Sequence, residues 1–387
     1  MSQKPLLIFC ITLLLSIPLA SCGNAVLAGG AVSWKNQEIY DEFINQATLE
    51  DGTIYIGIIT AGISLSIAKS TATDIANQLR LKYGVQNAEW LPFHPDSGTT
   101  CKSDQWNDKL NQMTGLYFNG GDVFPIVSCF LNSPALSIIQ SRYASGDLAI
   151  FGSSAGSMAM QSTPVRSMRE SWSALVYGST YAARAGLGLF NAGIMDVHFS
   201  TRGRLGALAR FVYDYQSSST IGFGVDQDTA FVTTDDDLFE VVGTSGVSII
   251  DVSEASKYSP DGNGKRWAIR NVKVSYLTDG DSYYASSGEI VFADDKSELE
   301  GSDSVTPRTT SNVFGDGAFI SVARSLFSSS ETETSGTTME SKPRYEIDFR
   351  KEDDSVGYSS GSLISFRNLY VDIYCVLNCW WGEELSC

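Results

Sequence analysis

Short apolar segments alternate with helical patterns over the first 150 residues, and this alternation restricts the fold more than any other feature. The segments that we predict as buried strands each run into Gly or another turn former: Ala25–Leu27, Ile54–Ile59, Leu116–Phe118 and Leu148–Phe151. Between them lie two helical patterns, Glu38–Gln46 and Ile67–Tyr83. Strand–helix alternation predicts an α/β fold, with a parallel sheet and helices on both faces. In such sheets the functional site lies at the carboxyl ends of the strands.

The character of the sequence changes after about Val241. Four later segments are predicted as strands, the last two as edge strands: Val241–Val252, Val272–Leu277, Tyr345–Phe349 and Leu369–Tyr374. A Gly-rich turn, Ser259–Lys265, separates the first two, and Asp294–Lys342 is rich in Ser, Thr, Gly and acids, which is typical of loops. We therefore divide the chain into a main α/β domain, residues 23–290, and a region of loops and C-terminal strands, residues 291–387.

The N-terminal residues are typical of a signal peptide. Leu6–Ala20 is apolar but short for a membrane span, and residues 1–22 are expected to be removed from the mature protein. The run ends in Leu-Ala-Ser-Cys, so two alternatives stay open: ordinary cleavage near Cys22, or a lipoprotein with a lipid on Cys22. Both predict a secreted, periplasmic or extracellular protein, and the second adds attachment to a membrane.

Charge and cysteine content restrict the partners. The net charge of −17, from 44 acids and 27 bases, argues against nucleic acid and anionic lipid. Export permits disulfides, and we expect Cys101–Cys129 and a pairing within the tail that holds Cys375, Cys379 and Cys387. The cysteine spacing does not fit a zinc site.

The sharpest local signal is Gly152-Ser153-Ser154-Ala155-Gly156, which follows an apolar strand. A Gly-x-Ser-x-Gly turn between strand and helix exposes the Ser154 hydroxyl, and directs the Ala155 N–H toward a developing oxyanion. The alternative interpretation is a Gly/Ser loop that caps a helix. The strand before the motif and the helix-compatible residues after it favour a nucleophile.

A serine nucleophile needs a base, and the chain has only two histidines. His94 lies in a turn-forming Pro-Phe-His-Pro-Asp context, where we expect a surface role. His198 follows a short predicted strand, so it is the better candidate for the general base. Candidates for the acid that orients it lie downstream, in Gly224–Ala230. Because no His follows that segment, the Ser–acid–His order of esterases and lipases is not met.

Four linked motifs resemble those of the cyanophycinases, serine peptidases whose family also contains aspartyl dipeptidase (peptidase E). In order along the chain they are Gly120-Gly121-Asp122, the serine turn at 152–156, Asp196-x-His198-Phe199-Ser200 with Arg202-Gly203-Arg204-Leu205-Gly206, and Gly224-x-Asp226-x-Asp228-Thr229-Ala230. The resemblance runs from about Ala25 to about Ile290. It implies a class I glutamine-amidotransferase-like α/β fold and serine-type hydrolysis of peptide or isopeptide bonds next to aspartyl residues, with no metal or organic cofactor.

The resemblance also implies roles for individual residues. Ser154 would be the nucleophile and His198 the base, and the Gly121 region would add a second oxyanion donor beside Ala155. Three residues would contact the substrate: Asp122, Arg202 and Arg204. The alternative for the arginines is a solvated or structural pair. Homodimer formation is a further option that the sequence leaves open.

The departures from the family pattern are as informative. Val123, Val197 and Ala207 replace two glutamines and an arginine, so we expect cyanophycin to be a poor substrate. Gln227 stands where the triad acid is expected, and it carries no charge to stabilise an imidazolium. Asp196 is an alternative acid, because on a strand it shares a side with His198. A rival hypothesis is a non-catalytic extracytoplasmic binding protein that keeps the fold.

Overall fold

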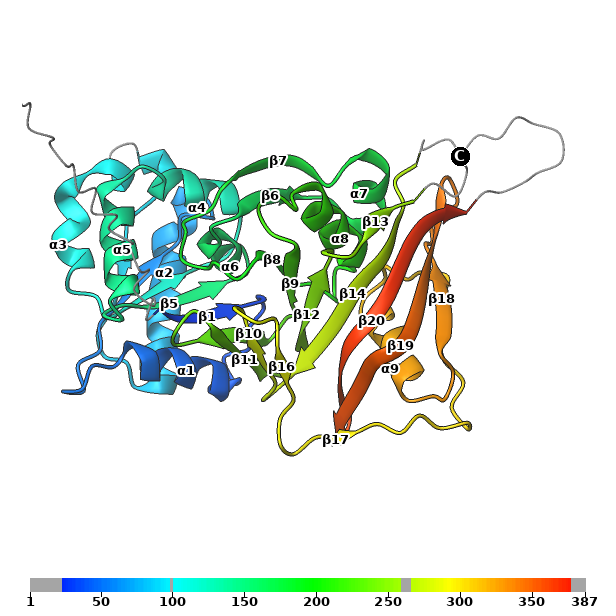
Figure 1. Ribbon diagram of the computed structural model, residues 1–387. Coiled ribbons are helices and arrows are strands. Elements are labelled where there is room, and N and C mark those ends of the chain that lie inside the picture. The colour runs from blue at the N-terminus through cyan, green and yellow to red at the C-terminus, as the bar shows by residue number, and fades with distance from the viewer. Residues whose placement is uncertain (1–22, 98–99, 259–265, 377–387) are drawn as a thin grey trace, which may run out of the picture.

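The molecule consists of two large sheets with helices packed against their faces (Figure 1). The structure is a computed structural model, which describes residues 23–97, 100–258 and 266–376. Within these residues each sheet has nine strands, and one further two-stranded hairpin joins β6 (Pro164–Met168) to β7 (Thr180–Ala185).

The first sheet has the strand order β16-β15-β11-β10-β1-β5-β4-β2-β3. Its parallel part consists of β1 (Asn24–Ala28), β2 (Ile56–Ile59), β3 (Ala88–Leu91), β4 (Gly115–Phe118) and β5 (Ala149–Ser153). Antiparallel strands extend it beyond β1: β10 (Thr229–Thr233), β11 (Leu238–Gly243), β15 (Ser282–Tyr284) and β16 (Ile290–Val291). The carboxyl ends of the parallel strands therefore meet at one edge.

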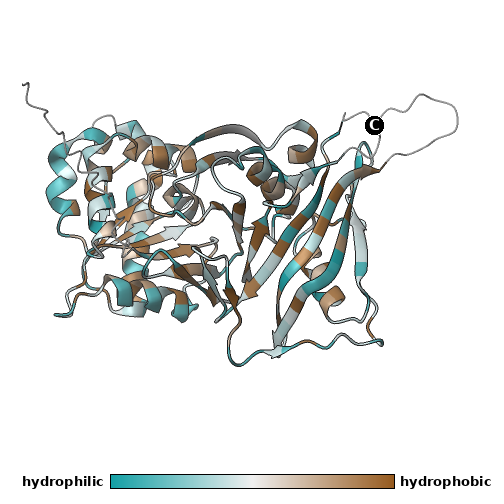
Figure 2. Ribbon diagram, viewed as in Figure 1, coloured by the Kyte–Doolittle hydropathy of each residue, from teal (hydrophilic) through white to brown (hydrophobic). Residues whose placement is uncertain are grey.

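Helices cover both faces of this sheet. One face packs against α1 (Gln37–Ala47) and α2 (Leu65–Tyr83), and the other against α4 (Val123–Phe130), α5 (Pro134–Ala144) and α6 (Ala155–Met160). Strand residues alternate between the two cores: Tyr117 packs with α1, whereas Leu116 and Phe118 pack with α4 and α5. Short helical segments connect β3 to β4: Pro95–Ser97, Thr100–Lys102, Asp104–Trp106 and α3 (Asn107–Leu110). Figure 2 shows the apolar residues concentrated along the strands.

The second sheet has the order β17-β19-β20-β14-β12-β9-β8. Its long strands are β8 (Ile194–Val197), β9 (Ile221–Val225), β12 (Gly246–Asp251), β14 (Ile269–Thr278), β19 (Arg344–Ser360) and β20 (Leu363–Val376). Short strands pair at its margins: β13 (Ser256–Lys257), β17 (Ser297–Glu298) and β18 (Glu333–Thr337). Its core includes side chains of α7 (Ser171–Tyr177), α8 (Leu205–Asp214) and α9 (Ala318–Phe327).

The predicted fold class is confirmed: a parallel-containing sheet with helices on both faces, and a strand-rich C-terminal region. The C-terminal strands differ from the prediction in one respect. β20 lies between β14 and β19, and the Tyr345–Phe349 part of β19 pairs with both β18 and β20, so the prediction of both as edge strands was wrong. The alternating pattern of β20 arises because only one face of this sheet packs on the α8 and α9 core.

The second sheet combines strands from both sides of residue 290, since β8, β9, β12 and β14 precede it and β19 and β20 follow it. The division at residues 290 and 291 stays a prediction. The segment Val241–Val252 forms two strands, because Thr244 and Ser245 turn the chain between β11 and β12.

The predicted Cys101–Cys129 disulfide is present and links the turn Thr100–Lys102 to α4. Cys375 is buried in the second core, whereas Cys379, Cys387, the turn Ser259–Lys265 and the signal segment 1–22 lie outside the described residues. In the described part of the chain, no single helix is long and apolar enough to cross a membrane; only α4 and α5 taken together, bent by 95°, reach that length and composition.

Candidate active site

Ser154 lies at a sharp turn between β5 and α6. Its backbone angles, φ 55° and ψ −119°, are rare for a residue with a side chain. The flanking glycines make this turn possible: an added Cβ would lie 2.7 Å from the Ser157 nitrogen at Gly152, and 2.2 Å from the Phe118 oxygen at Gly156. The predicted strand–turn–helix geometry is thus confirmed, at the carboxyl end of a central parallel strand.

His198 lies directly in front of this serine. Its Nε2 atom is 2.8 Å from Ser154 Oγ, although the two residues are 44 positions apart in the sequence. His198 follows β8 with φ 51°. Its backbone N–H donates to the Gly29 oxygen at 3.0 Å, which fixes the main chain of His198 next to the end of β1. The structure therefore brings together the two residues that the sequence proposes as nucleophile and base.

Gln227 occupies the other side of the imidazole. Its amide nitrogen lies 2.9 Å from His198 Nδ1, so the residue in the acid position contacts the histidine as a triad acid would. With the NH₂ group at Nδ1, the ring accepts there and carries its proton on Nε2, facing Ser154. A half-turn of the amide presents Oε1 instead, and Nδ1–H then donates while Nε2 is free to accept. Only the second arrangement gives the tautomer that a general base requires.

Asp196, the alternative acid, has other partners. Its Oδ1 accepts from the Val197 N–H at 2.8 Å and lies 3.3 Å from Arg204 Nη1 in a fully buried ion pair. Both ring nitrogens of His198 are occupied by Ser154 and Gln227. Asp196 therefore acts on the histidine through its charge, and Gln227 is the residue in hydrogen-bond contact.

The two aspartates beside Gln227 support the loops around the site. Asp226 is buried, and its carboxylate accepts from the Ser200 N–H, from the Ser245 hydroxyl and from the Tyr276 hydroxyl, each within 2.9 Å. Asp228 accepts from the Ser33 N–H at 2.8 Å. The hydrogen bonds of both carboxylates go to groups other than the imidazole, and they hold the turn that presents Gln227.

The surroundings of His198 favour the neutral imidazole. Burial, and after it the cations Arg202 and Arg204, lower the pKa of His198 to about 4, while Asp196 acts in the opposite direction. A Glu at position 227 would oppose these effects, whereas Gln227 adds no charge. The imidazole is therefore uncharged at neutral pH, but a weaker base than one with a pKa near 7.

Two glycines leave room for the catalytic pair. At Gly30, which has φ 96°, an added Cβ would lie 2.4 Å from His198 Cε1 and 2.9 Å from Ser154 Cβ. At Gly120, a Cβ would lie 3.0 Å from Ser154 Cβ. Sequence reasoning missed Gly30, although Gly29 and Gly30 directly follow a predicted strand, which is where a parallel sheet places its site.

The two predicted oxyanion residues are Ala155, which directly follows Ser154, and Gly121, which directly follows Gly120. Ala155 is the first residue of α6, so its N–H has no acceptor within the helix. Gly121 has φ 128° and packs against the Gly62 carbonyl, which leaves its neighbour Gly120 as the residue nearest the serine. The role of Gly121 as second donor stays a prediction.

The three predicted substrate residues are in different situations. Asp122 caps α4, because its Oδ1 accepts from the Phe124 N–H at 2.9 Å. Arg204 is buried against Asp196. Arg202 is exposed and lines a pocket of about 340 Å³ with Trp172 and Phe314. Arg202 is therefore the one whose guanidinium is open to a ligand.

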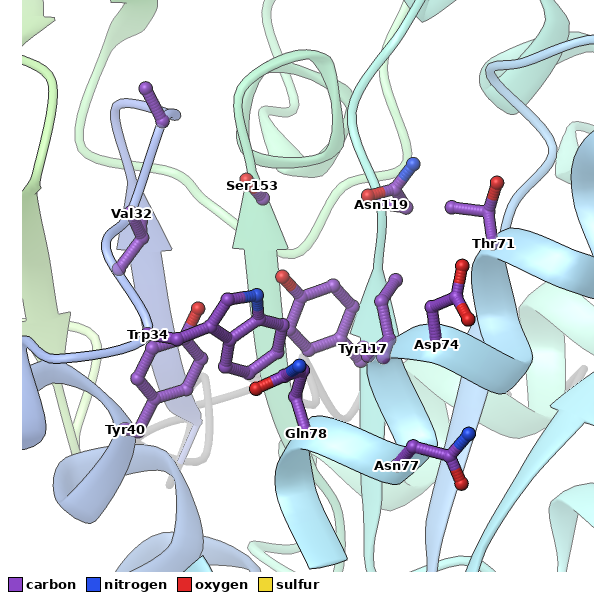
Figure 3. A pocket seen from close by; sticks show the side chains of 12 residues that line it. Val32, Trp34, Tyr40, Thr71, Asp74, Asn77, Gln78, Tyr117, Asn119 and Ser153 are labelled. Carbon is purple, nitrogen blue, oxygen red and sulfur yellow. The ribbon is translucent and has the colours of Figure 1, made fainter. Parts of the chain in front are cut away.

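Beside the nucleophile lies a pocket of about 610 Å³, the α1–α2 pocket (Figure 3). Trp34, Tyr40 and Tyr117 form its aromatic floor, and the Trp34 and Tyr40 rings stack at 4.6 Å. Asp74, Asn77, Gln78 and other polar groups of α2 line the far side. Asn119 and Ser153, which precede Gly120 and Ser154 in the sequence, also line the pocket (Figure 3).

Three further residues singled out in the sequence lie in the interior of the protein. Val123 and Val197, which replace glutamines of the family pattern, are both buried in the core around α4 and α5 and do not line the α1–α2 pocket. His94 was expected at the surface, but it is buried: its Nε2 lies 2.7 Å from the Ile63 oxygen, and its Nδ1 accepts from the Asp96 N–H. The turn context was correct, but the ring contacts two backbone groups, the Asp96 N–H inside the turn and the Ile63 carbonyl outside it.

Comparison with known families agrees with this geometry. The sequence model of Peptidase family S51 matches residues 97–241, which include Ser154, His198 and Gln227. The chain is 28% identical over 196 residues to the cyanophycinase of Trichormus variabilis, and 26% identical over 183 residues to that of Geminocystis herdmanii. These alignments cover 48% and 46% of this chain, and 61% and 65% of the two cyanophycinases. Residues 97–241 are thus similar to peptidase family S51, and about half of the chain is similar to cyanophycinases.

A solved structure supports the fold. The crystal structure of a peptidase from an acI-B1 Actinobacterium aligns with a TM-score of 0.50 and 19% identity, over 68% of this chain and 98% of that one. The chain spans about three fifths of the length of the cyanophycinases it matches, so activity and substrate are matters for a proposal.

Proposed function

We propose that the protein is a serine-type peptidase that cleaves peptide or isopeptide bonds near aspartyl residues. The observation that carries this proposal is the 2.8 Å contact between Ser154 Oγ and His198 Nε2, at a strained turn that faces the carboxyl ends of the parallel strands. A structural serine does not need φ 55° or a histidine at hydrogen-bond distance. The match of residues 97–241 to a peptidase family supports the same reaction class.

The chemistry follows from these positions. Ser154 Oγ attacks the carbonyl carbon while its proton passes to His198 Nε2. The oxygen of the tetrahedral intermediate accepts a hydrogen bond from the Ala155 N–H. The imidazolium then returns the proton to the leaving nitrogen as the C–N bond breaks, which leaves an acyl group on Ser154. Water, deprotonated by His198, hydrolyses this ester. Each step uses groups of the chain and needs no other reactant than water.

Gln227 makes this cycle slow in our account. Its amide holds the imidazole in place and can stabilise the tautomer with the proton on Nδ1, but it carries no charge to stabilise the imidazolium. The low pKa of His198 points in the same direction. We therefore propose a working but slow hydrolase.

The substrate is proposed from the shape and polarity around Ser154. The α1–α2 pocket would accept a residue on one side of the scissile bond, and the exposed guanidinium of Arg202 would bind a carboxylate. Cyanophycin is not the substrate we favour, because valines stand where the family pattern has two glutamines. Val123 and Val197 have no polar side-chain atoms and are packed in the core, so they do not replace the contacts that two glutamines would make with the substrate.

We also propose that the protein works outside the cytoplasm. The signal-like residues 1–22 support export, and the Cys101–Cys129 disulfide is a bond that oxidising compartments preserve. Lipid attachment at Cys22 and ordinary cleavage predict different masses for the mature N-terminus, which mass spectrometry of the native protein would measure.

A second candidate function is a binding protein that has kept the fold but lost turnover. Gln227 and the depressed pKa of His198 favour it. The two candidates are separated by screening purified mature protein against a library of aspartyl dipeptides and isopeptides, with Ser154→Ala as the blank. Release of amine above the blank supports the peptidase. Rates equal to the blank for every substrate would overturn it.

A further inference from the structure

A second hollow lies away from Ser154, between α9 and the second sheet. It has a volume of about 510 Å³, and we call it the α9 pocket. One face of α9 lines it, through residues spaced three or four apart: Gly317, Ile320, Ser321, Arg324, Ser325 and Ser328. The segment around Arg308 and the side chains of Ser200, Ser245 and Tyr276 complete the wall.

The polar lining consists of cations and hydroxyl groups. Arg308 and Arg324 are its two charged side chains, and among the described residues neither guanidinium is ion-paired with a carboxylate. This is unusual in a chain with a net charge of −17. Six hydroxyl-bearing side chains besides Tyr276 also line the pocket: Ser200, Ser245, Thr306, Ser321, Ser325 and Ser328.

The two arginines are fixed in place. Arg308 Nη1 donates to Ser321 Oγ at 2.8 Å, and the Arg308 N–H donates to Ser325 Oγ at 2.8 Å. Arg324 Nε donates to the Ile364 oxygen at 3.3 Å, and its guanidinium lies 5.2 Å from the centre of the Tyr276 ring. Each guanidinium uses one of its five N–H groups in these hydrogen bonds, and the bond to Ser325 comes from the Arg308 backbone. The remaining groups form a positive, donor-rich site that is already organised.

We propose that the α9 pocket binds an oxyanion, a carboxylate or a phosphate carried by a small ligand. Planar guanidinium groups recognise both anions through paired hydrogen bonds, and the hydroxyls can complete the shell. Arg308 and Arg324 lie beyond residues 97–241, so both cations come from outside the part of the chain that matches the peptidase family, whereas Ser200 of that part also lines the pocket.

The site is connected to the loop that carries His198. Ser200 and Ser245 line the pocket, and both donate to the buried carboxylate of Asp226, the residue before Gln227. The Gly317 N–H at the start of α9 donates to the Ser200 oxygen at 3.0 Å. A bound anion would therefore stabilise the segment from His198 to Arg204, because the pocket wall and that segment share these hydrogen bonds.

The test is direct binding, measured by isothermal titration calorimetry of the Ser154→Ala protein with inorganic phosphate, succinate and an acidic tetrapeptide. Activity is not the readout, so failure here leaves the proposed peptidase untouched. We expect binding of at least one probe, weakened tenfold or more, about 1.4 kcal/mol, in the Arg308→Gln/Arg324→Gln protein. Arg367→Gln removes the same charge from an exposed arginine outside the pocket, and should leave the affinity unchanged.

Two further measurements keep the proposal falsifiable. If the double variant does not fold by circular dichroism, Arg308→Gln alone is used, because that side chain is exposed. Hydrogen exchange of residues 198–204 should slow when the binding probe is present. No binding of any probe up to about 10 mM, or equal affinity of the wild-type and arginine variants, would overturn the site. Binding without slower exchange would overturn the connection to the His198 loop.

Discussion

The side-chain amide of Gln227 lies 2.9 Å from Nδ1 of His198, on the side of the imidazole opposite Ser154. A triad acid would place a negative charge at this point. Gln227 occupies the same position but carries no charge. The consequence is a histidine whose tautomer depends on the orientation of one amide, and whose pKa is lowered by burial and two arginines.

Restoring the charge should therefore speed the reaction. We predict that Gln227→Glu raises kcat/KM at pH 7 by about tenfold or more, or about 1.4 kcal/mol of barrier, because the carboxylate fixes Nδ1–H and stabilises the imidazolium. Initial rates on one activated ester, with Ser154→Ala as the blank, measure this. A Gln227→Glu enzyme no faster than wild type, with its fold intact, contradicts the assignment of Gln227 to the acid position.

The pH dependence gives an independent prediction. The base must be unprotonated, so kcat/KM should rise with pH through a midpoint near 4 and stay level from about pH 5 to 7. In Gln227→Glu the midpoint should move upward. A wild-type midpoint near 6.5 would show that burial and the arginines do not act on His198 as the structure indicates.

Stability must be followed in the same experiment. The folded-state pKa of His198 is below its ordinary value of 6.5, so the unfolded chain binds the extra proton first. Protonation of His198 therefore lowers the free energy of unfolding as pH falls from about 6.5 toward 4. Above pH 6.5 this residue does not change the free energy of unfolding. Circular dichroism at each pH separates loss of fold from protonation of the base.

Gly30 offers a steric test of the pair. A Cβ at this position would lie 2.4 Å from His198 Cε1 and 2.6 Å from Nε2, so Gly30→Ala should separate His198 from Ser154 and reduce kcat/KM by about 100-fold or more. Gly52→Ala is the matched control, because Gly52 also has positive φ but nothing lies within 4 Å of its added Cβ. Equal loss in both variants would mean that backbone strain alone explains the effect.

The sequence predicted the contact between Ser154 and His198 because both signals are local. The glycines around Ser154 and the shortage of histidines led to the correct contact, and short apolar runs located the parallel strands. The position of β20 was not predictable, because an alternating strand looks the same at the edge and in the interior of a one-sided sheet. Gly30 was missed because the lack of space for a side chain there is due to His198, which is 168 residues away. The burial of His94 likewise depends on the Ile63 carbonyl, which lies outside the turn that holds His94.

The Cys101–Cys129 disulfide should stabilise the α4 side of the first sheet. It closes a loop with a sequence separation of 28, for which restriction of the unfolded chain gives about 3.5 kcal/mol. We predict that the Cys101→Ser/Cys129→Ser protein loses stability of this order in urea unfolding, with little change in secondary structure. A difference below about 0.5 kcal/mol would mean that the bond adds no constraint.

The central claim is that His198 activates Ser154 as a nucleophile, and covalent labelling tests it most directly. A fluorophosphonate probe forms a bond from Ser154 Oγ to phosphorus as fluoride leaves, with the serine proton passing to His198. Intact-mass and peptide analysis should find one label on Ser154 in the wild type and none in Ser154→Ala. Labelling of His198→Ala should be slower by about 10³-fold or more. A wild-type protein that stays unlabelled, or one labelled at another residue, would contradict the account.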